Sequence, residues 1–326
     1  MNATPLVSAI IVNWNGEHHL KICLPSLRAQ TYKALEIIVV DNGSTDDSAE
    51  VTREFQARWL PLGKNVGLAP ALNRGVAQAG GDFLLFVNND MRFDPGFVAA
   101  LSEPLRKNAE IFATDGMQFN WDGSERAHLA TRLVRRKPGS GSSTELVSGL
   151  YFYPSEADRE TAVYTGSAAC MLVRRKFFEK LTGFDDRLPL GYEDVEICWR
   201  AWIRGWKTVY VPTAICWHHI GSSGRSSEGM RMNFRGILRG RLVLASKLLP
   251  LRYVVRTWLA SIAGLGKDVS RLRWSFAKDR INTLVATAGL MPQLLRERKE
   301  LFRNARSSPE KHLDLLLQLA GDAVRF

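Results

Sequence analysis

Residues 35–48, LEIIVVDNGSTDDS, decide the fold of this chain. The run Leu35–Val40 is mostly apolar and rich in β-branched residues, a pattern typical of a strand covered on both faces in a parallel sheet. The loop that follows consists of turn-forming and helix-capping residues, which predicts a helix from Ser48 to about Arg58. A buried strand that leads directly into a helix indicates an α/β fold.

The alternation of strands and helices continues on both sides of this stretch. Apolar runs predict strands at Val7–Asn13 and Asp82–Val87, and helical spacing of apolar residues predicts helices at Glu17–Gln30 and Leu68–Ala79. Right-handed crossovers place the carboxyl ends of the three strands at one edge, where open α/β sheets bind ligands. We therefore predict a Rossmann-like, mostly parallel sheet flanked by helices.

The later part of the chain changes character. Residues 118–160 show little periodicity and include PGSGSS at 138–143, which predicts a mobile loop or a β-excursion. Beyond about residue 230 the pattern is apolar and basic with helical spacing. We expect an α/β catalytic domain over residues 1–228 and a basic amphipathic helical appendage over residues 229–326.

The net charge of +11 raises the question of an anionic partner. The first hundred residues are nearly balanced, and the excess of bases lies at 132–137 and from Arg225 to Arg306. Bases interleaved with Leu, Val, Trp and Tyr fit an anionic membrane surface at least as well as nucleic acid, and no nucleic-acid-binding module is recognisable. We expect Arg239, Arg241, Arg252 and Arg256 to meet headgroups while Trp258 enters the interface.

Other features bound the location of the protein. The most apolar segment, Leu242–Gly266, is interrupted by Lys247, Pro250 and two arginines, so a membrane-spanning helix is not expected. The N-terminus enters a strand without a basic leader, which favours a cytoplasmic protein on the inner face of the membrane. The four cysteines contain no C-x-x-C pair, so buried free thiols are expected.

Polar residues follow the first two predicted strands and precede the Leu68–Ala79 helix. Asp41 ends a strand, where its carboxylate can accept the imide N–H of a pyrimidine base or ribose hydroxyls, although a capping role explains Asp41 equally well. A nucleotide site at this edge would draw on a set of residues from several segments. The candidates are Asn13, Asn15, Asp41, Asn65, Gly67, Asn73, Asn88 and Asn89.

Asp90 and His218 are candidate metal ligands. Asn88-Asn89-Asp90 follows the third strand, where an acid can hold Mg²⁺ or Mn²⁺ against a diphosphate, the alternative being a simple turn. His218 and His219 follow a predicted strand and precede Gly221-Ser222-Ser223, so one imidazole can complete the site.

Asp194 is the candidate catalytic base. It lies with Glu193 in the first turn of a predicted helix, where the helix dipole alone favours acids. An acid on a rigid helix end that faces the ligand edge can also take the proton of an acceptor hydroxyl. The sequence offers no convincing second carboxylate for a double displacement.

Together these motifs resemble the family-2 glycosyltransferases, in particular the rhamnosyltransferase-like branch that builds bacterial surface glycans. The matching segments include SAIIVNWNG, EIIVVDNGSTDDS, NVGLAPALNRG, FLLFVNNDMRFDPG, the stretch from Thr165 to Ala214 and WHHIGSS. The family has the A-type glycosyltransferase fold. The resemblance implies that Asp41 contacts the base, Asp90 and His218 bind the metal, and Asp194 is the base. The family's metal motif usually has two acids, and Asn88 stands in place of the first.

The resemblance implies an inverting, metal-dependent transfer of one sugar from a nucleotide diphosphate to a hydroxyl of a cell-surface or polyprenyl-linked glycan. Rhamnose from a dTDP donor is the expected sugar, with UDP-linked hexoses or galactofuranose as alternatives. A sugar-1-phosphate nucleotidyltransferase lacks support because no Gly-rich phosphate loop follows the first strand. A protein that binds nucleotide or nucleic acid without catalysis stays an alternative from another class.

Overall fold

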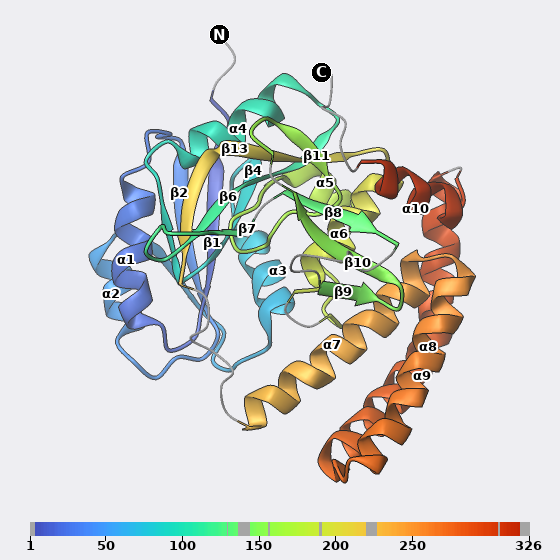
Figure 1. Ribbon diagram of the computed structural model, residues 1–326. Helices are drawn as coiled ribbons and strands as arrows, with labels where there is room; N and C mark the ends of the chain where they lie inside the picture. The colour runs from blue at the N-terminus through green and yellow to red at the C-terminus, as the bar shows by residue number, and fades with distance from the viewer. Residues whose placement is uncertain are drawn as a thin grey trace.

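A computed structural model describes residues 4–128, 130–135, 144–155, 157–188, 191–219, 227–305 and 307–319 (Figure 1). The strands are β1 Val7–Asn13, β2 Leu35–Asp41, β3 Arg58–Pro61, β4 Phe83–Asn88, β5 Met91–Phe93, β6 Ile111–Asn120, β7 Arg126–His128, β8 Ala130–Val134, β9 Thr144–Val147, β10 Leu150–Ser155, β11 Thr161–Val163, β12 Leu172–Arg174 and β13 Lys207–His218. The helices are α1 Glu17–Arg28, α2 Ser48–Glu54, α3 Leu68–Gln78, α4 Phe97–Lys107, α5 Arg175–Lys180, α6 Glu193–Ile203, α7 Ser227–Leu248, α8 Leu251–Ser270, α9 Trp274–Ala305 and α10 Pro309–Gln318.

The central sheet confirms the predicted α/β class. Its order is β11-β13-β6-β12-β4-β1-β2-β3, and β1 pairs in parallel with both β2 and β4. In register, Asn13 stands opposite Asp41, and Val12 opposite Asn88. The carboxyl ends of β1, β2 and β4 therefore meet at one edge, as the crossover argument predicts.

One local expectation, a helix that reaches Arg58, was wrong, and two features of the sheet were not predicted. Arg58 begins β3, parallel to β2, because the helix before it already ends at Glu54. The residues after Asp90, which look like the exit of a turn, form the short strand β5 and pair with β13. β12 lies antiparallel between β4 and β6, so the sheet is mixed in its centre.

Helices cover both faces of the sheet. One apolar core joins the inner faces of α1, α2 and α4 to the sheet, and another joins α3, α5 and α6 to its opposite face. β8, β10 and β9 form a separate antiparallel sheet, which agrees with a β-excursion; residues 136–143, which include PGSGSS, lie outside the described residues. Cys23, Cys170, Cys198 and Cys216 are buried free thiols, as expected.

The C-terminal helices share an apolar core with α6 and the small sheet of the α/β part. Trp199 and Trp202 of α6 pack in the same apolar cluster as Val243 of α7 and Leu294 of α9, together with the β8-β10-β9 sheet. Figure 1 shows α7 to α10 on the side of α6 and this small sheet, away from α1 and α2. The boundary at residue 228 stays a prediction. Among the described residues, no helix combines the length and apolar character needed to span a membrane.

Candidate active site

The ends of β1 and β2 carry a preorganised loop over residues 41–45. The Asp41 carboxylate is 4% exposed and accepts hydrogen bonds from the backbone N–H of Ser44 at 3.1 Å and of Gly43 at 3.3 Å. Asn15 holds the same loop from outside, because its Oδ1 accepts from the Thr45 N–H at 2.8 Å. Asp41 and Asn15 thus shape the loop.

The loop is also tied to the start of α3. The buried Asn42 side chain accepts a hydrogen bond from the Val66 N–H at 2.8 Å and donates to Asn65 Oδ1 at 3.1 Å and the Gly67 carbonyl at 3.3 Å. Gly67 has φ +90°, a left-handed conformation that favours glycine. Asn42 was missed as a site residue because it stands in a turn-forming run where any polar residue is expected.

Asn73 is engaged away from this loop. Its amide donates to the Phe184 carbonyl at 2.9 Å and to Asp186 Oδ1 at 2.7 Å, and it accepts from the Phe184 N–H at 3.0 Å. These bonds fasten α3 to the segment that leads into α6. A contact between Asn73 and a nucleotide stays a prediction.

The turn after β4 is fixed by close packing. Asn89 donates to Asn13 Oδ1 at 2.7 Å, and both side chains press against the backbone of Gly16. A Cβ at Gly16 would lie 2.0 Å from Asn89 Nδ2 and 2.4 Å from Asn13 Oδ1, so no side chain fits at Gly16 without moving them. The absence of a side chain at Gly16 therefore leaves the space in which Asn13 and Asn89, which precede Asp90, bond to each other.

The pairing of β5 with β13 brings Asp90 and His218 together. Met91 is the register partner of His218, and the Asp90 carbonyl accepts from the His219 N–H at 3.0 Å. His218 Nε2 lies 3.2 Å from Asp90 Oδ1, with side chains 17% and 16% exposed. The structure thus places His218, rather than His219, beside the Asp90 carboxylate; the His219 ring instead lies 5.5 Å from the rings of His19 and Trp121.

The Asp90–His218 pair fits a divalent cation. A carboxylate oxygen and an imidazole nitrogen that already face each other, with access to solvent, are suitable donors for Mn²⁺ or Mg²⁺. Within the described ranges no group of three or more His, Cys, Asp or Glu is arranged to hold a metal ion. A cation here would therefore need further oxygen ligands, such as those of a diphosphate. The Gly-Ser loop at 221–223 lies outside the described residues.

Asp194 lies at the same edge, at the start of α6. Its Oδ1 accepts from the Val195 N–H at 2.7 Å, and its Oδ2 accepts from the Ala168 N–H at 3.4 Å. The next residue, Ala169, accepts from the Asn88 N–H at 3.1 Å through its carbonyl. Asp194 and the end of β4 are therefore hydrogen-bonded to two neighbouring residues, Ala168 and Ala169.

The neighbouring acid, Glu193, is buried and has a raised pKa. It is 1% exposed, and burial together with the charge of Asp194 raises the pKa of Glu193 to about 8. Burial and the neighbouring carboxylate of Asp194 therefore both disfavour the ionised form of Glu193.

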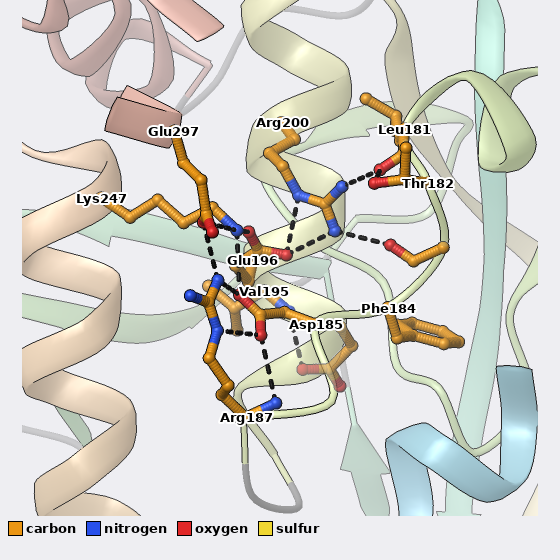
Figure 2. Close-up of polar contacts among 12 residues, drawn as sticks. Leu181, Thr182, Phe184, Asp185, Arg187, Val195, Glu196, Arg200, Lys247 and Glu297 are labelled. Atoms are coloured by element: carbon orange, nitrogen blue, oxygen red, sulfur yellow. Dashed lines mark hydrogen bonds and ion pairs between the residues drawn. The ribbon is translucent and has the colours of Figure 1, made fainter. Parts of the chain in front are cut away.

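A buried ion cluster links α6 to α7 and to the segment before α6 (Figure 2). Glu196 of α6 is bound by Arg200 at 2.6 Å and by Lys247 of α7 at 2.7 Å, and Lys247 also lies 2.9 Å from Asp185. Arg200 donates to the carbonyls of Leu181 and Gly183, which fixes the segment before α6. The cluster consists of Asp185, Arg187, Glu196, Arg200, Lys247 and Glu297.

Sequence reasoning missed this cluster. Lys247 belongs to a basic stretch that looks like a solvated helix face, and nothing in the local pattern shows that it is 7% exposed. Burial alone would lower the pKa of Lys247, but the charges of Glu196 and Asp185 outweigh burial and raise it. Three carboxylates and three cations balance each other, which is the condition for burying charge.

The mixed α/β sheet flanked by helices is the fold of the A-type glycosyltransferases, as expected. The solved structure of the mannosyltransferase PcManGT from Pyrobaculum calidifontis, in complex with GDP-Man and Mn²⁺, has this fold. It superposes with a TM-score of 0.56 at 16% identity, covering 98% of this chain and 85% of that one. S. aureus TarS 1–349 with UDP-GlcNAc gives a TM-score of 0.52 at 17% identity, covering 95% and 92%.

Residues 8–182 match the family described as Glycosyl transferase family 2. The chain belongs to this family, which confirms the resemblance drawn from its motifs. An N-acetylglucosaminyl-diphospho-decaprenol L-rhamnosyltransferase from Mycobacterium tuberculosis is 29% identical over 292 residues. The comparison covers 76% of this chain and 93% of that protein. The chain is thus a family-2 glycosyltransferase with similarity to a rhamnosyltransferase.

Proposed function

We propose that this protein is an inverting, metal-dependent glycosyltransferase that uses Asp194 as its catalytic base. The observation that carries the proposal is the convergence of Asp41, the Asp90–His218 pair and Asp194 at one sheet edge of a family-2 glycosyltransferase. This edge offers a base for the acceptor and a charged site for the donor diphosphate.

The transfer is a single displacement. Asp194 takes the proton of the acceptor hydroxyl, whose oxygen forms a bond to the anomeric carbon while the bond from that carbon to the diphosphate oxygen breaks. Attack from the face opposite the leaving group inverts the anomeric centre. Glu193 is buried and its pKa is raised, which disfavours the ionised form that a nucleophile for a double displacement needs.

Asp90 and His218 would hold the divalent cation. A bound Mg²⁺ or Mn²⁺ supplies positive charge against the developing charge of the leaving diphosphate. The loop at 41–45 and the Asn65–Gly67 segment would bind the nucleoside. Asn13, Asn88 and Asn89 would fix the turn that carries Asp90.

The donor is dTDP-rhamnose and the acceptor is a polyprenyl-diphosphate-linked sugar. The proposal rests on the rhamnosyltransferase relative, whose name states an N-acetylglucosaminyl-diphospho-decaprenol acceptor. UDP-linked hexoses are the second candidate for the donor, because uracil and thymine share the imide N–H that a carboxylate such as that of Asp41 can accept. A lipid-linked acceptor places the enzyme at the cytoplasmic face of the membrane.

Release of nucleotide diphosphate tests the proposal. The purified full-length chain is incubated with a panel of dTDP-, UDP- and GDP-sugars, with Mn²⁺ or Mg²⁺ and with chelator. We expect metal-dependent release from one donor. Asp90→Ala should abolish it, whereas Asp82→Ala, which removes an acid next to the opposite end of β4, should retain it.

A second experiment tests Asp194 as the catalytic base. Asp194→Asn should bind the donor nucleotide with near-normal affinity and lose turnover by about a hundredfold or more. Full turnover by Asp194→Asn would remove Asp194 from this role. No release from any donor, together with no thermal shift by any nucleotide, would refute the site assignment.

A further inference from the structure

The outer face of α8 is apolar along its whole length. Leu251, Val255, Leu259, Ile262 and Val269 are between 39% and 70% exposed. At about 100° per residue these five side chains fall within an arc of roughly 80° on one side of the helix. The opposite side, with Tyr253, Thr257 and Asp268, is buried against the protein. An unpartnered stripe of this kind indicates an interaction surface.

The charges beside this stripe are all of one sign. Arg252, Arg256 and Lys267 fall within the adjoining arc of roughly 60° and are exposed. Two of them, Arg252 and Arg256, line a shallow hollow together with Leu251, Val255, Leu259, Ala260 and Ala263. The stripe therefore has a cationic margin along one side.

Acidic residues do not balance this charge at the surface. The segment 249–292 contains seven Lys or Arg and only two acids, Asp268 and Asp279. Both acids are 3% exposed; Asp268 is paired with Arg280 at 2.8 Å and Asp279 with Arg231 at 2.7 Å. Every exposed charged side chain of this segment is a cation.

The turn between α8 and α9 continues the pattern. Leu272 and Trp274 are 73% and 61% exposed, and they are flanked by Arg271 and Arg273. Figure 1 shows α8 and α9 side by side as a hairpin that reaches beyond the α/β sheet and ends in this turn. An exposed Trp and Leu among arginines at the end of a projecting hairpin suit the interface between headgroups and acyl chains.

We infer that the outer face of α8 and the α8–α9 turn form a docking face for an anionic lipid bilayer, referred to here as the α8 face. A second copy of the chain fits less well, because pairing two α8 faces would bring cations together without acids to neutralise them. Anionic headgroups supply the missing charge, and the interface accepts the apolar stripe.

This inference deepens the proposed function, on which it rests for a lipid-linked acceptor, and it leaves out two residues that were expected at the membrane. Trp258 donates to Ser246 Oγ at 3.1 Å, and Arg241 is bound to Glu145, so both side chains contact the protein. The face that points to solvent carries Val255 and Leu259 beside Arg252, one of the arginines that were expected to meet headgroups.

Vesicle flotation of the full-length protein tests the α8 face. Vesicles contain phosphatidylcholine with about a third phosphatidylglycerol, or phosphatidylcholine alone. We expect flotation with the anionic vesicles at low salt and loss with neutral vesicles. Arg252→Gln with Arg256→Gln should weaken partitioning by about fivefold per removed cation. Lys33→Gln with Lys180→Gln removes the same charge from the catalytic part and should not change partitioning.

A second set of variants tests the apolar stripe. Val255→Asp with Leu259→Asp should lower partitioning by at least about tenfold. Ile22→Asp, at an exposed apolar position on α1, is the matched control and should float like the unchanged protein. Circular dichroism and metal-dependent nucleotide release from the donor are measured on every variant.

The outcomes separate the α8 face from the proposed function. Failure of the unchanged protein to float, while it still releases nucleotide, would overturn the α8 face and leave the proposed function standing. Flotation that responds to the α8 variants, without release from any donor, would support the face and refute the proposed function. A dimer that Val255→Asp with Leu259→Asp dissociates, without flotation, would assign the face to a second copy and overturn the inference.

Discussion

Removal of the Lys247 charge should destabilise the protein by about 3 kcal/mol. The buried ion cluster contains three cations and three anions, so Lys247→Met leaves one uncompensated negative charge among Asp185, Glu196 and Glu297. Breaking a buried ion pair costs about 3–5 kcal/mol. The lower end applies because Arg200 still binds Glu196 and Arg187 still binds Asp185.

The expected signal is a lower thermal midpoint. Unfolding entropy is about 2.1 cal/mol/K per residue, or roughly 0.7 kcal/mol/K for 326 residues, so about 3 kcal/mol lowers Tm by about 4 °C. Differential scanning calorimetry on the purified chain measures this shift. Lys278→Met, at an exposed position on α9, is the control and should move Tm by less than about 1 °C.

A second variant distinguishes charge balance from lost packing. Lys247→Met with Glu297→Gln restores equal numbers of cations and anions, so we expect it to recover about 1–2 kcal/mol of the loss. A Tm for Lys247→Met within about 1 °C of the unchanged protein would refute the reasoning. So would a double variant that is less stable than Lys247→Met alone.

Three further predictions follow from the same geometry. Gly16→Ala should break the Asn89–Asn13 hydrogen bond and slow donor turnover by roughly ten- to a hundredfold, and a near-normal rate would contradict this. Burial would raise the pKa of Asp185, but Arg187 and Lys247 outweigh burial and lower it; Asp185 thus contributes stability that is present above its ordinary pKa and lost as pH falls. Tm should therefore fall between pH 5 and 3, and less steeply in Lys247→Met. The pKa of Glu193 is raised to about 8, so ionisation of this carboxyl costs the folded state stability as pH rises. Glu193→Gln should therefore raise Tm relative to the unchanged protein more at pH 9 than at pH 6. An equal difference at the two pH values would contradict the raised pKa.

The sequence by itself determined the fold class and the edge at which the candidate site lies. Apolar β-branched runs specify β1, β2 and β4, and right-handed crossovers leave one arrangement for their ends. Polar residues that follow such strands must then meet, which is why Asn13, Asp41 and Asn88 were predicted at one edge; Asn13 is found there opposite Asp41, and Asn88 opposite Val12. The family followed from the same motifs and their order.

Only the tertiary structure decided which side chains face each other across that edge. The family resemblance implied that His218 and Asp90 share a metal, but their contact arises because β5 pairs with the end of β13, which joins distant segments that no local pattern connects. The space at Gly16 is likewise set by Asn13 and Asn89 from other elements.

The burial of charge was also invisible in the sequence. Lys247 and Arg252 stand in one basic, apolar stretch, yet Lys247 is enclosed in the ion cluster and Arg252 is exposed on α8. Helical spacing shows which residues share a face, but the direction of that face depends on what the helix packs against. The packing of α7 and α9 on α6 therefore separates Lys247, the cation that binds Glu196 of α6, from the cations of the α8 face.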